Sequence, residues 1–196
     1  FLIKYDSVGA TMWTRQAGTT SDDAFTCVAV DPAGNVYATG YTNGCLGEEN
    51  LGKADILVTK VDPSGNLLWV RQIGTAGDDY GRSLAVDSSG VVYVVGYTNA
   101  DLGGASSGYE DAFLLKLDAT GELAWIIQAG TPNGDLAYSV AIDGSDAVLV
   151  GGSTYGSLGG PHEGIYDAFL LKYVVPEPAS LGLLLAGAAA VIRRRR

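Results

Sequence analysis

A repeat of 56 residues runs through most of this chain and limits its fold more than any other feature of the sequence. Several residue types recur at this spacing over three periods, without an insertion or a deletion. They include Lys4, Lys60, Lys116 and Lys172; Trp13, Trp69 and Trp125; Gln16, Gln72 and Gln128; and Asp55, Asp111 and Asp167. Such self-similarity is typical of architectures in which one small structural unit stacks on the next.

Each repeat contains four segments that have the composition of β-strands. In the middle copy these segments are 83–87, 91–98, 111–118 and 123–130. Two of the turns between them read Asp-x-x-Gly, which supplies the glycine that a tight hairpin needs. The repeat therefore predicts short antiparallel strands joined by tight turns.

The predicted strands are apolar on both faces. In the third strand of the middle copy, Phe113, Leu115 and Leu117 share one face, and Ala112 and Leu114 share the other. A strand with one solvated face would alternate between apolar and polar residues. Two buried faces mean that each sheet is covered on both sides, which predicts an all-β propeller of four-stranded antiparallel blades. A right-handed β-solenoid is the alternative, although its rungs are usually much shorter.

The phase of the repeat divides the chain into blades. We expect the outer strands of one blade in 1–18, full blades at about 25–74 and 80–130, and a partial blade at about 137–173 that lacks its outermost strand. The chain starts within a strand-like run at Phe1, without an initiator Met. We therefore expect a propeller fragment, and we expect the missing upstream part to supply the strand that completes the last blade.

Two segments of the middle copy carry a resemblance to a known family. They are Asp-Ala-Phe-Leu-Leu-Lys-Leu-Asp at 111–118 and Val-Tyr-Val-Val-Gly-Tyr-Thr at 92–98. With the recurring Trp, Gly-Thr and Ala-Val-Asp positions, they resemble the bacterial SBBP repeat of seven-bladed β-propellers. The resemblance covers residues 1 to about 172, and it implies an extracytoplasmic propeller without an established common activity.

The composition changes after residue 173. A short segment at 175–180 contains two prolines that flank a glutamate, and prolines interrupt both strand and helix. An apolar run of 14 residues follows at 179–192 and would form a helix about 21 Å long, shorter than a bilayer core of about 30 Å. The chain ends on a membrane-stop cluster of Arg193, Arg194, Arg195 and Arg196. Arginines are costly to translocate, so they predict a cytoplasmic end and an acidic repeat body outside.

The order of these parts resembles the PEP-CTERM sorting signal, with Pro176, Glu177 and Pro178 as the motif. The sorting segment is 174–196, and the resemblance covers 175–196. It implies an exosortase, a membrane cysteine protease, as a processing partner. It also implies a Gram-negative bacterium that makes exopolysaccharide. The chain would be held in the inner membrane by a short transmembrane-type helix before processing, and would then reach the cell surface or the extracellular space. The alternative is a simple C-terminal tail anchor.

The charge balance argues against nucleic acid as a partner. The chain has 12 lysines and arginines against 22 acidic residues, for a net charge of −10. Four of the basic residues are the terminal arginines, which leaves eight in the rest of the chain. A body this acidic would repel a phosphate backbone.

Acidic pairs precede the first strand of the repeats. They are Asp22–Asp23, Asp78–Asp79 and, in the third copy, Gly134–Asp135. Such carboxylates could bind Ca²⁺ or act as an acid and a base, but aspartate is also favoured for turn and capping hydrogen bonds. Because the pairs nearly follow the repeat, we expect the structural role. The segments 31–35 and 62–66 are faintly like calcium loops but lack the distal Glu, so we expect type I turns.

The remaining candidates for chemistry are few. Cys27 and Cys45 have no counterparts in the other repeats, and an exported location would permit a disulfide between them, although two reduced thiols are the default. No Cys-x-x-Cys spacing predicts zinc. His162 is the single histidine and is expected to be a solvated loop residue. We expect the recurring tryptophans to pack blades rather than to bind sugars. We predict no catalytic residue, no cofactor and no metal site.

These observations favour a non-enzymatic surface or matrix protein. The Gly-rich loops at 43–53, 99–109 and 156–165 differ most between the repeats, and variable loops on a fixed scaffold usually carry binding specificity. The expected partners are an exopolysaccharide or an envelope protein. The alternative is a propeller enzyme, a glycan hydrolase or lyase, whose catalytic blade lies in the missing part of the chain.

Overall fold

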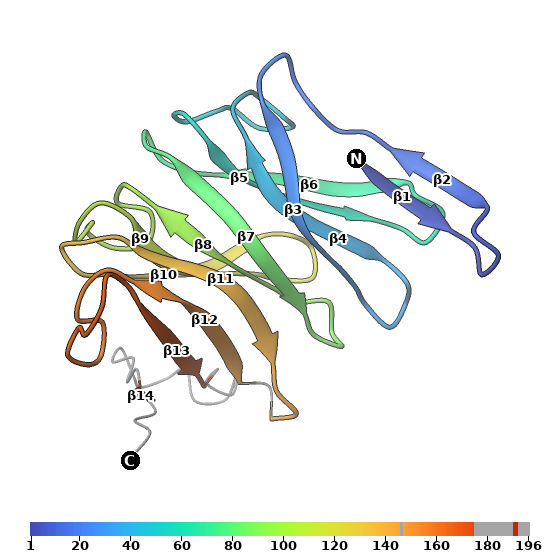
Figure 1. Cartoon of the computed structure of the whole chain (residues 1–196). Helices are drawn as coiled ribbons and strands as arrows, with labels where there is room; N and C mark the ends of the chain where they lie inside the picture. The colour runs from blue at the N-terminus through green and yellow to red at the C-terminus, as the bar shows by residue number, and fades with distance from the viewer. Residues whose placement is uncertain (146, 175–189, 192–196) are drawn as a thin grey trace.

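The computed structural model describes residues 1–145 and 147–174, together with the backbone of 190–191, and its elements are all β-strands (Figure 1). β1 (Leu2–Tyr5) and β2 (Thr11–Arg15) form a two-stranded sheet. In the part of the chain that the structure describes there is no helix that could cross a membrane. The apolar helix predicted at 179–192 falls outside the described residues, except for the backbone of β14 (Ala190–Val191).

Three larger antiparallel sheets follow the β1–β2 sheet, and in each the strands pair in the order of the sequence. The first blade comprises β3 (Asp23–Val30), β4 (Val36–Thr42), β5 (Asp55–Val61) and β6 (Leu67–Ile73). The second comprises β7 (Asp79–Val86), β8 (Val92–Thr98), β9 (Asp111–Leu117) and β10 (Leu123–Ala129). The third comprises β11 (Asp135–Ile142), β12 (Val148–Thr154), β13 (Asp167–Tyr173) and the two-residue β14. The all-β prediction of four-stranded antiparallel sheets is therefore confirmed.

The blades are stacked face to face, and apolar side chains fill both interfaces. Phe113, Leu115 and Leu117 of β9 belong to the cluster between the first and second blades. Ala112 and Leu114 of the same strand belong to the cluster between the second and third blades. The prediction that both faces of this strand are buried is confirmed, because alternate residues of one strand contribute to two cores.

The tryptophans of the repeat connect one blade to the turn of the next. The Trp13 indole donates a hydrogen bond of 3.0 Å to the carbonyl of Pro63 and lies against Gly65. Trp69 lies in the same way against Gly121, where an added Cβ would be 2.9 Å from the ring. Both glycines have positive φ, so the turn needs glycine for its conformation as well as for the ring's approach. These contacts agree with the packing role expected for the tryptophans.

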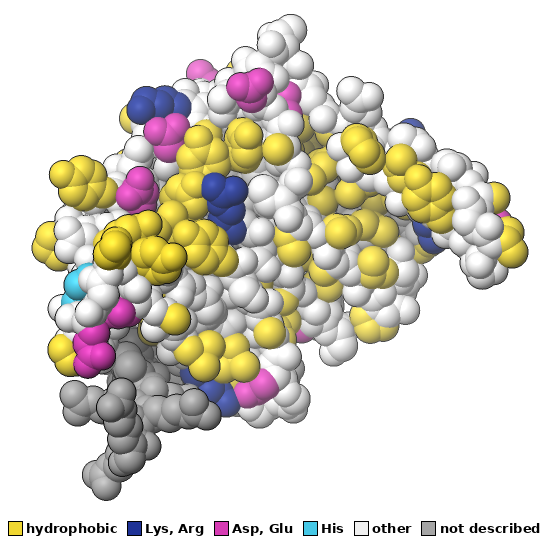
Figure 2. All heavy atoms as spheres, in the orientation of Figure 1, with side chains coloured by type: hydrophobic (Ala, Val, Ile, Leu, Met, Phe, Trp, Pro, Cys, Tyr) yellow, Lys and Arg dark blue, Asp and Glu magenta, His cyan; other side chains and the backbone are white. Residues whose placement is uncertain are grey.

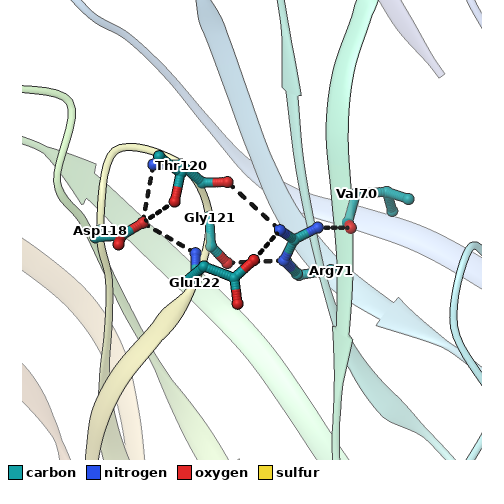
Figure 3. A network of polar contacts seen from close by, with 6 residues as sticks. All are labelled: Val70, Arg71, Asp118, Thr120, Gly121 and Glu122. Atoms are coloured by element: carbon teal, nitrogen blue, oxygen red, sulfur yellow. Dashed lines mark hydrogen bonds and ion pairs between the residues drawn. The ribbon is translucent and has the colours of Figure 1, made fainter.

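An arginine next to the tryptophan strengthens this connection (Figure 3). Arg71 of β6 donates from Nε to the carbonyl of Gly121 at 2.9 Å and from Nη2 to Glu122 at 2.7 Å. The carboxylate of Asp118 in turn accepts hydrogen bonds from the amides of Thr120 and Glu122, which fixes the turn that Arg71 contacts. The outer strand of one blade is thus attached to the β9–β10 turn of the next.

A β-bulge recurs in the first strand of each blade. The register shifts between Phe25 and Cys27 in β3, between Gly81 and Ser83 in β7, and between Ala137 and Ser139 in β11. One extra residue therefore stands at the same point of each blade, namely Thr26, Arg82 and Tyr138. A bulge bends the strand and can redirect the side chain of the extra residue.

The bulged strand approaches a glycine of the second strand so closely that no side chain fits there. A Cβ added at Gly96 would lie 1.8 Å from the carbonyl oxygen of Tyr80, and one added at Gly152 would lie 2.1 Å from that of Leu136. The obstacle is backbone, which cannot rotate away. Glycine recurs at this position because the backbone of the first strand leaves no room for a Cβ atom.

We predict that Gly152→Ala lowers the free energy of unfolding by about 2 kcal/mol, the scale of overpacking a filled site. The matched control is Gly151→Ala, because the neighbouring residue of the same strand has no atom within 4 Å of its added Cβ. Urea unfolding of the two variants and the wild type tests this. Equal losses in both variants would contradict the steric explanation.

Candidate functional site

A buried aspartate and a glutamine hold the loop between the second and third strands of each full blade. Asp55 accepts hydrogen bonds of 2.9 Å from the amide of Leu51 and from the side chain of Gln72. The Gln72 side chain also accepts from the amide of Leu46 and donates to the carbonyl of Gly44. One carboxylate and one amide therefore fix both ends of this loop.

The second blade repeats the arrangement. Asp111 accepts hydrogen bonds from the amide of Ser107 at 2.8 Å and from Gln128 at 2.9 Å, and Gln128 also accepts from the amide of Leu102. Asp55 and Asp111 are both fully buried. Their position and partners give them a structural role, and the loops that they hold can differ in sequence without a change in the scaffold.

The second aspartate of each acidic pair also has structural partners. Asp79 accepts hydrogen bonds from the amide and the hydroxyl of Thr75, at 2.6 and 2.8 Å. Asp135 accepts the same two bonds from Thr131, and Asp23 accepts them from Thr19. Among the described residues there is no group of three or more His, Cys, Asp or Glu that could hold a metal ion. Each aspartate therefore fixes the connecting segment that leads from one blade into the first strand of the next.

Asp79 is costly to ionise in this position. Burial raises its pKa above the usual 3.8, and the nearby charge of Asp55 adds to this, whereas the hydrogen bonds from Thr75 act in the opposite direction. Exposed turn aspartates behave differently. The side chain and the amide of Asn66 donate to Asp62 at 2.8 Å each and lower the pKa of this carboxyl.

Two hollows flank Tyr155 at the loop end of the third blade. One is lined by Tyr109, Glu110, Asn133, Leu136 and Tyr155, and the other by Thr131, Pro132, Asn133, Tyr155, Ser157 and His162, with neighbouring glycines. The ring of Tyr166 lies 5.6 Å from that of Tyr155. The two hollows lie between the second and third of the variable loops. We call this region the Tyr155 hollows.

His162 occupies a defined place in these hollows. Its Nδ1 atom lies 3.2 Å from a carboxylate oxygen of Asp167, and both side chains are half-buried. Asp167 is the third-blade counterpart of Asp55 and Asp111, which are bound instead by glutamine. The expectation of a solvated loop residue is therefore wrong in part, because His162 packs beside a carboxylate.

Sequence reasoning missed a cluster of three tyrosines and an arginine near the β7 bulge, which we call the Arg82 cluster. The rings of Tyr41 and Tyr80 lie 5.0 Å apart, and those of Tyr80 and Tyr97 lie 5.3 Å apart. The Arg82 guanidinium lies 5.4 Å from the Tyr80 ring and 5.0 Å from the Tyr97 ring. It also donates a hydrogen bond to the Tyr97 hydroxyl.

The signal for this cluster was present in the repeat itself. The residues at the position of Tyr80 in the other blades are Ala24 and Leu136. Those at the position of Arg82 are Thr26 and Tyr138. A search for departures from the repeat among all residue types, rather than among acids and histidine alone, would have found it.

Neither of the two predicted cysteines lines the Tyr155 hollows. Cys27 and Cys45 are free thiols in the structure, with Cys27 half-buried and its Sγ 3.8 Å from the Ser83 hydroxyl, and with Cys45 exposed. The sorting-motif residues Pro176, Glu177 and Pro178 and the cluster at 193–196 lie outside the described residues.

Comparison with family models gives the repeat and the C-terminal segment an identity. The model of the SBBP beta-propeller repeat matches residues 13–46 and 68–103, and the model of the PEP-CTERM protein-sorting motif matches 174–196. The chain carries SBBP β-propeller repeats and a PEP-CTERM sorting motif. Each SBBP match starts at the outermost strand of one sheet and ends after the second strand of the next. The PEP-CTERM motif implies export, an exosortase-type processing partner and a membrane-anchored stage before surface display.

Two curated proteins are similar in sequence to this chain over a small part of their own length. The chain is 30% identical over 165 residues to the regulatory protein FlaEY of Caulobacter vibrioides, which covers 76% of this chain and 17% of that protein. It is 26% identical over 196 residues to an uncharacterized WD repeat-containing protein of Acanthamoeba polyphaga mimivirus, which covers 78% of this chain and 14% of that protein. The chain thus spans less than a fifth of the length of either relative.

We predict opposite pH dependences for Asp79→Asn and Asp62→Asn. Because the pKa of Asp79 is raised by folding, its ionisation costs stability, and this cost is absent below the unfolded pKa of 3.8 and grows as the pH rises through the folded value. The wild type should therefore lose stability relative to Asp79→Asn as the pH rises above 3.8.

For Asp62 the folded pKa is lowered, so its contribution is present above 3.8 and is lost as the pH falls through the folded value. The wild type should lose stability relative to Asp62→Asn on acidification. Urea unfolding of the three proteins at a series of pH values measures both differences. Parallel pH profiles for the two variants would contradict these assignments.

Proposed function

We propose that this protein is an exported, non-enzymatic surface or matrix protein whose blades present loops to an extracellular glycan or an envelope protein. The PEP-CTERM motif supports the export and the exosortase step. The SBBP repeats support a scaffold role, since their recurring polar residues are used to hold loops and turns. The inner-membrane stage of the tail and the final location at the cell surface or beyond are part of the proposal.

The observation that carries the binding role is the position of the Tyr155 hollows. They lie beside the loops that differ most between the repeats. Tyr155 itself departs from the repeat, since the other copies have Asn43 and Asn99 at this position. Tyr109 and Tyr166 are 75% and 61% exposed beside them, so their rings are available to a partner. Exposed aromatic rings with a few polar groups around a hollow are typical of ligand sites.

The scaffold around these hollows favours binding over chemistry. The buried aspartates have structural hydrogen bonds, and His162 faces Asp167 without a nucleophile in a recognisable context. A glycoside hydrolase needs two carboxyl groups on opposite sides of the scissile bond. The glycan hydrolase or lyase remains the competing proposal, with its catalytic blade elsewhere in the full protein.

We predict that Tyr155→Ala weakens binding of the host's exopolysaccharide about tenfold, which corresponds to about 1.4 kcal/mol. The matched control is Tyr5→Ala, which removes an exposed tyrosine from β1. Binding by immobilised polysaccharide and release of reducing ends are measured on the same samples of the full chain. Product formation by the wild type would contradict the non-enzymatic role, and equal binding by both variants would contradict the assignment to the hollows.

We predict that Glu177→Ala blocks processing of the tail in a host that has an exosortase. The chain should then accumulate in the membrane fraction at its unprocessed mass, because the protease reads the Pro-Glu-Pro segment. Glu49→Ala, which changes an exposed glutamate of a blade loop, is the control and should be processed normally. Fractionation and mass spectrometry of the C-terminal peptide measure the outcome. Normal processing of Glu177→Ala would contradict the role of the motif.

A further inference from the structure

We propose that the Arg82 cluster is a second binding site, specific for a saccharide that carries a carboxylate group, such as a uronic acid residue. The inference rests on the proposed function in one respect, that the protein meets glycans outside the cell. It concerns a site separate from the Tyr155 hollows, so experiments can refute one of the two proposed sites without refuting the other.

The first argument is the position of the arginine. In Figure 1 the first strands of the three blades, β3, β7 and β11, lie side by side on the viewer's side of the stack. The extra residue of each bulge therefore recurs along this side. Thr26 uses its hydroxyl to bond the carbonyls of Thr39 and Gly81, and Tyr138 is exposed. Only the middle bulge presents a cation.

The tyrosines hold that cation in place. The guanidinium lies over two rings, Tyr80 and Tyr97, at distances at which the ring faces attract a positive charge. The hydrogen bond to the Tyr97 hydroxyl fixes its orientation. A planar guanidinium that is already oriented loses little conformational freedom when it binds a partner. Figure 2 shows hydrophobic side chains gathered over β7, with a basic side chain among them.

The hydrogen-bonding capacity of Arg82 is largely unused. Its Nε has no acceptor among the described residues, whereas the Nε atoms of Arg15 and Arg71 donate to the turn carbonyls of Gly65 and Gly121. Because this Nε is buried, a ligand would bind the terminal Nη groups of Arg82. Among the described residues no carboxylate lies within ion-pair distance of Arg82, a property that it shares with Lys4, Arg15, Lys60 and Lys116 but not with Lys53, Arg71 and Lys172. An oriented guanidinium without an anion, in a protein of net charge −10, is a site for a ligand anion.

The surroundings define the class of that anion. A guanidinium matches a carboxylate or a phosphate through two parallel hydrogen bonds. The three half-buried tyrosines add apolar ring surface that the guanidinium does not cover, together with the hydroxyls of Tyr41 and Tyr80, and the C–H face and hydroxyls of a sugar ring can pack on them. A free inorganic anion would use the arginine alone. The combination therefore selects a saccharide with a carboxylate.

The acidity of the whole chain favours a glycan that carries few carboxylates. A polymer with a charge on every residue would be repelled by the surrounding carboxylates over about 10 Å at an ionic strength of about 0.1 M. A saccharide with isolated carboxylates avoids most of this repulsion. We therefore expect a preference for a sparsely charged glycan over a polyuronate.

Calorimetric titration of the full chain tests the site with three probes. They are a glucuronic-acid-containing disaccharide, its neutral glucose counterpart and inorganic phosphate. We expect the wild type to bind the acidic disaccharide at least about tenfold more tightly than the neutral one, the scale of a hydrogen-bonded charge pair. Arg82→Gln should remove this preference, and Arg82→Lys should recover only part of it because a lysine lacks the planar fork.

Two further variants keep the test decisive. Tyr97→Phe removes only the hydroxyl that orients Arg82, and we expect a smaller loss of the same preference in a protein with unchanged stability. Tyr5→Ala, which removes an exposed tyrosine from β1 outside both sites, should leave binding of the acidic disaccharide unchanged. If Tyr155→Ala abolished this binding and Arg82→Gln did not, the Arg82 cluster would be refuted and the proposed function kept. Equal binding of acidic and neutral probes, wild-type binding by Arg82→Gln, or phosphate binding as tight as the disaccharide would each overturn the inference.

Discussion

Burial of both faces of the middle sheet is the constraint on which the rest of this structure depends. A single four-stranded sheet of this composition would expose both of its apolar faces, and its free energy gain on folding would be small. Stacking removes both faces from water, so that β9 contributes to the core on each side of its sheet. The sheets must then approach closely and in a fixed order, which is why small residues and backbone contacts recur at the same points of every repeat.

The polar residues of the repeat serve this packing rather than oppose it. A buried carboxylate such as Asp55 is tolerated because amide and side-chain donors satisfy one of its oxygens. In return, Asp55 fixes the loop between the second and third strands of its blade. Residues that recur in every repeat therefore form the scaffold, whereas residues that vary between the repeats form the loops. The Tyr155 hollows and the Arg82 cluster both arise where the repeat departs from itself.

The sequence allowed the strands, their pairing order and their two-sided burial to be predicted, because hydrophobic periodicity and turn residues are local signals that a repeat amplifies. It showed that Asp55 and Gln72 recur but not that they meet, since their contact depends on how β5 and β6 pair. The place of His162 beside Asp167 was missed for the same reason. The bulge at Arg82 was beyond prediction, because an extra residue in a strand is a property of pairing and not of composition.

The contact between a tryptophan ring and a turn glycine depends on which residue the next repeat supplies. Each such contact needs a glycine in the following repeat: Gly65 lies against Trp13, and Gly121 lies against Trp69. The corresponding residue for Trp125 would be Glu177, the central residue of the PEP-CTERM motif, and Trp125 instead contacts the ring of Tyr173 at 5.2 Å. Trp125 therefore meets an aromatic ring of its neighbouring blade, so this last inter-blade contact differs in chemistry from the two tryptophan–glycine contacts before it.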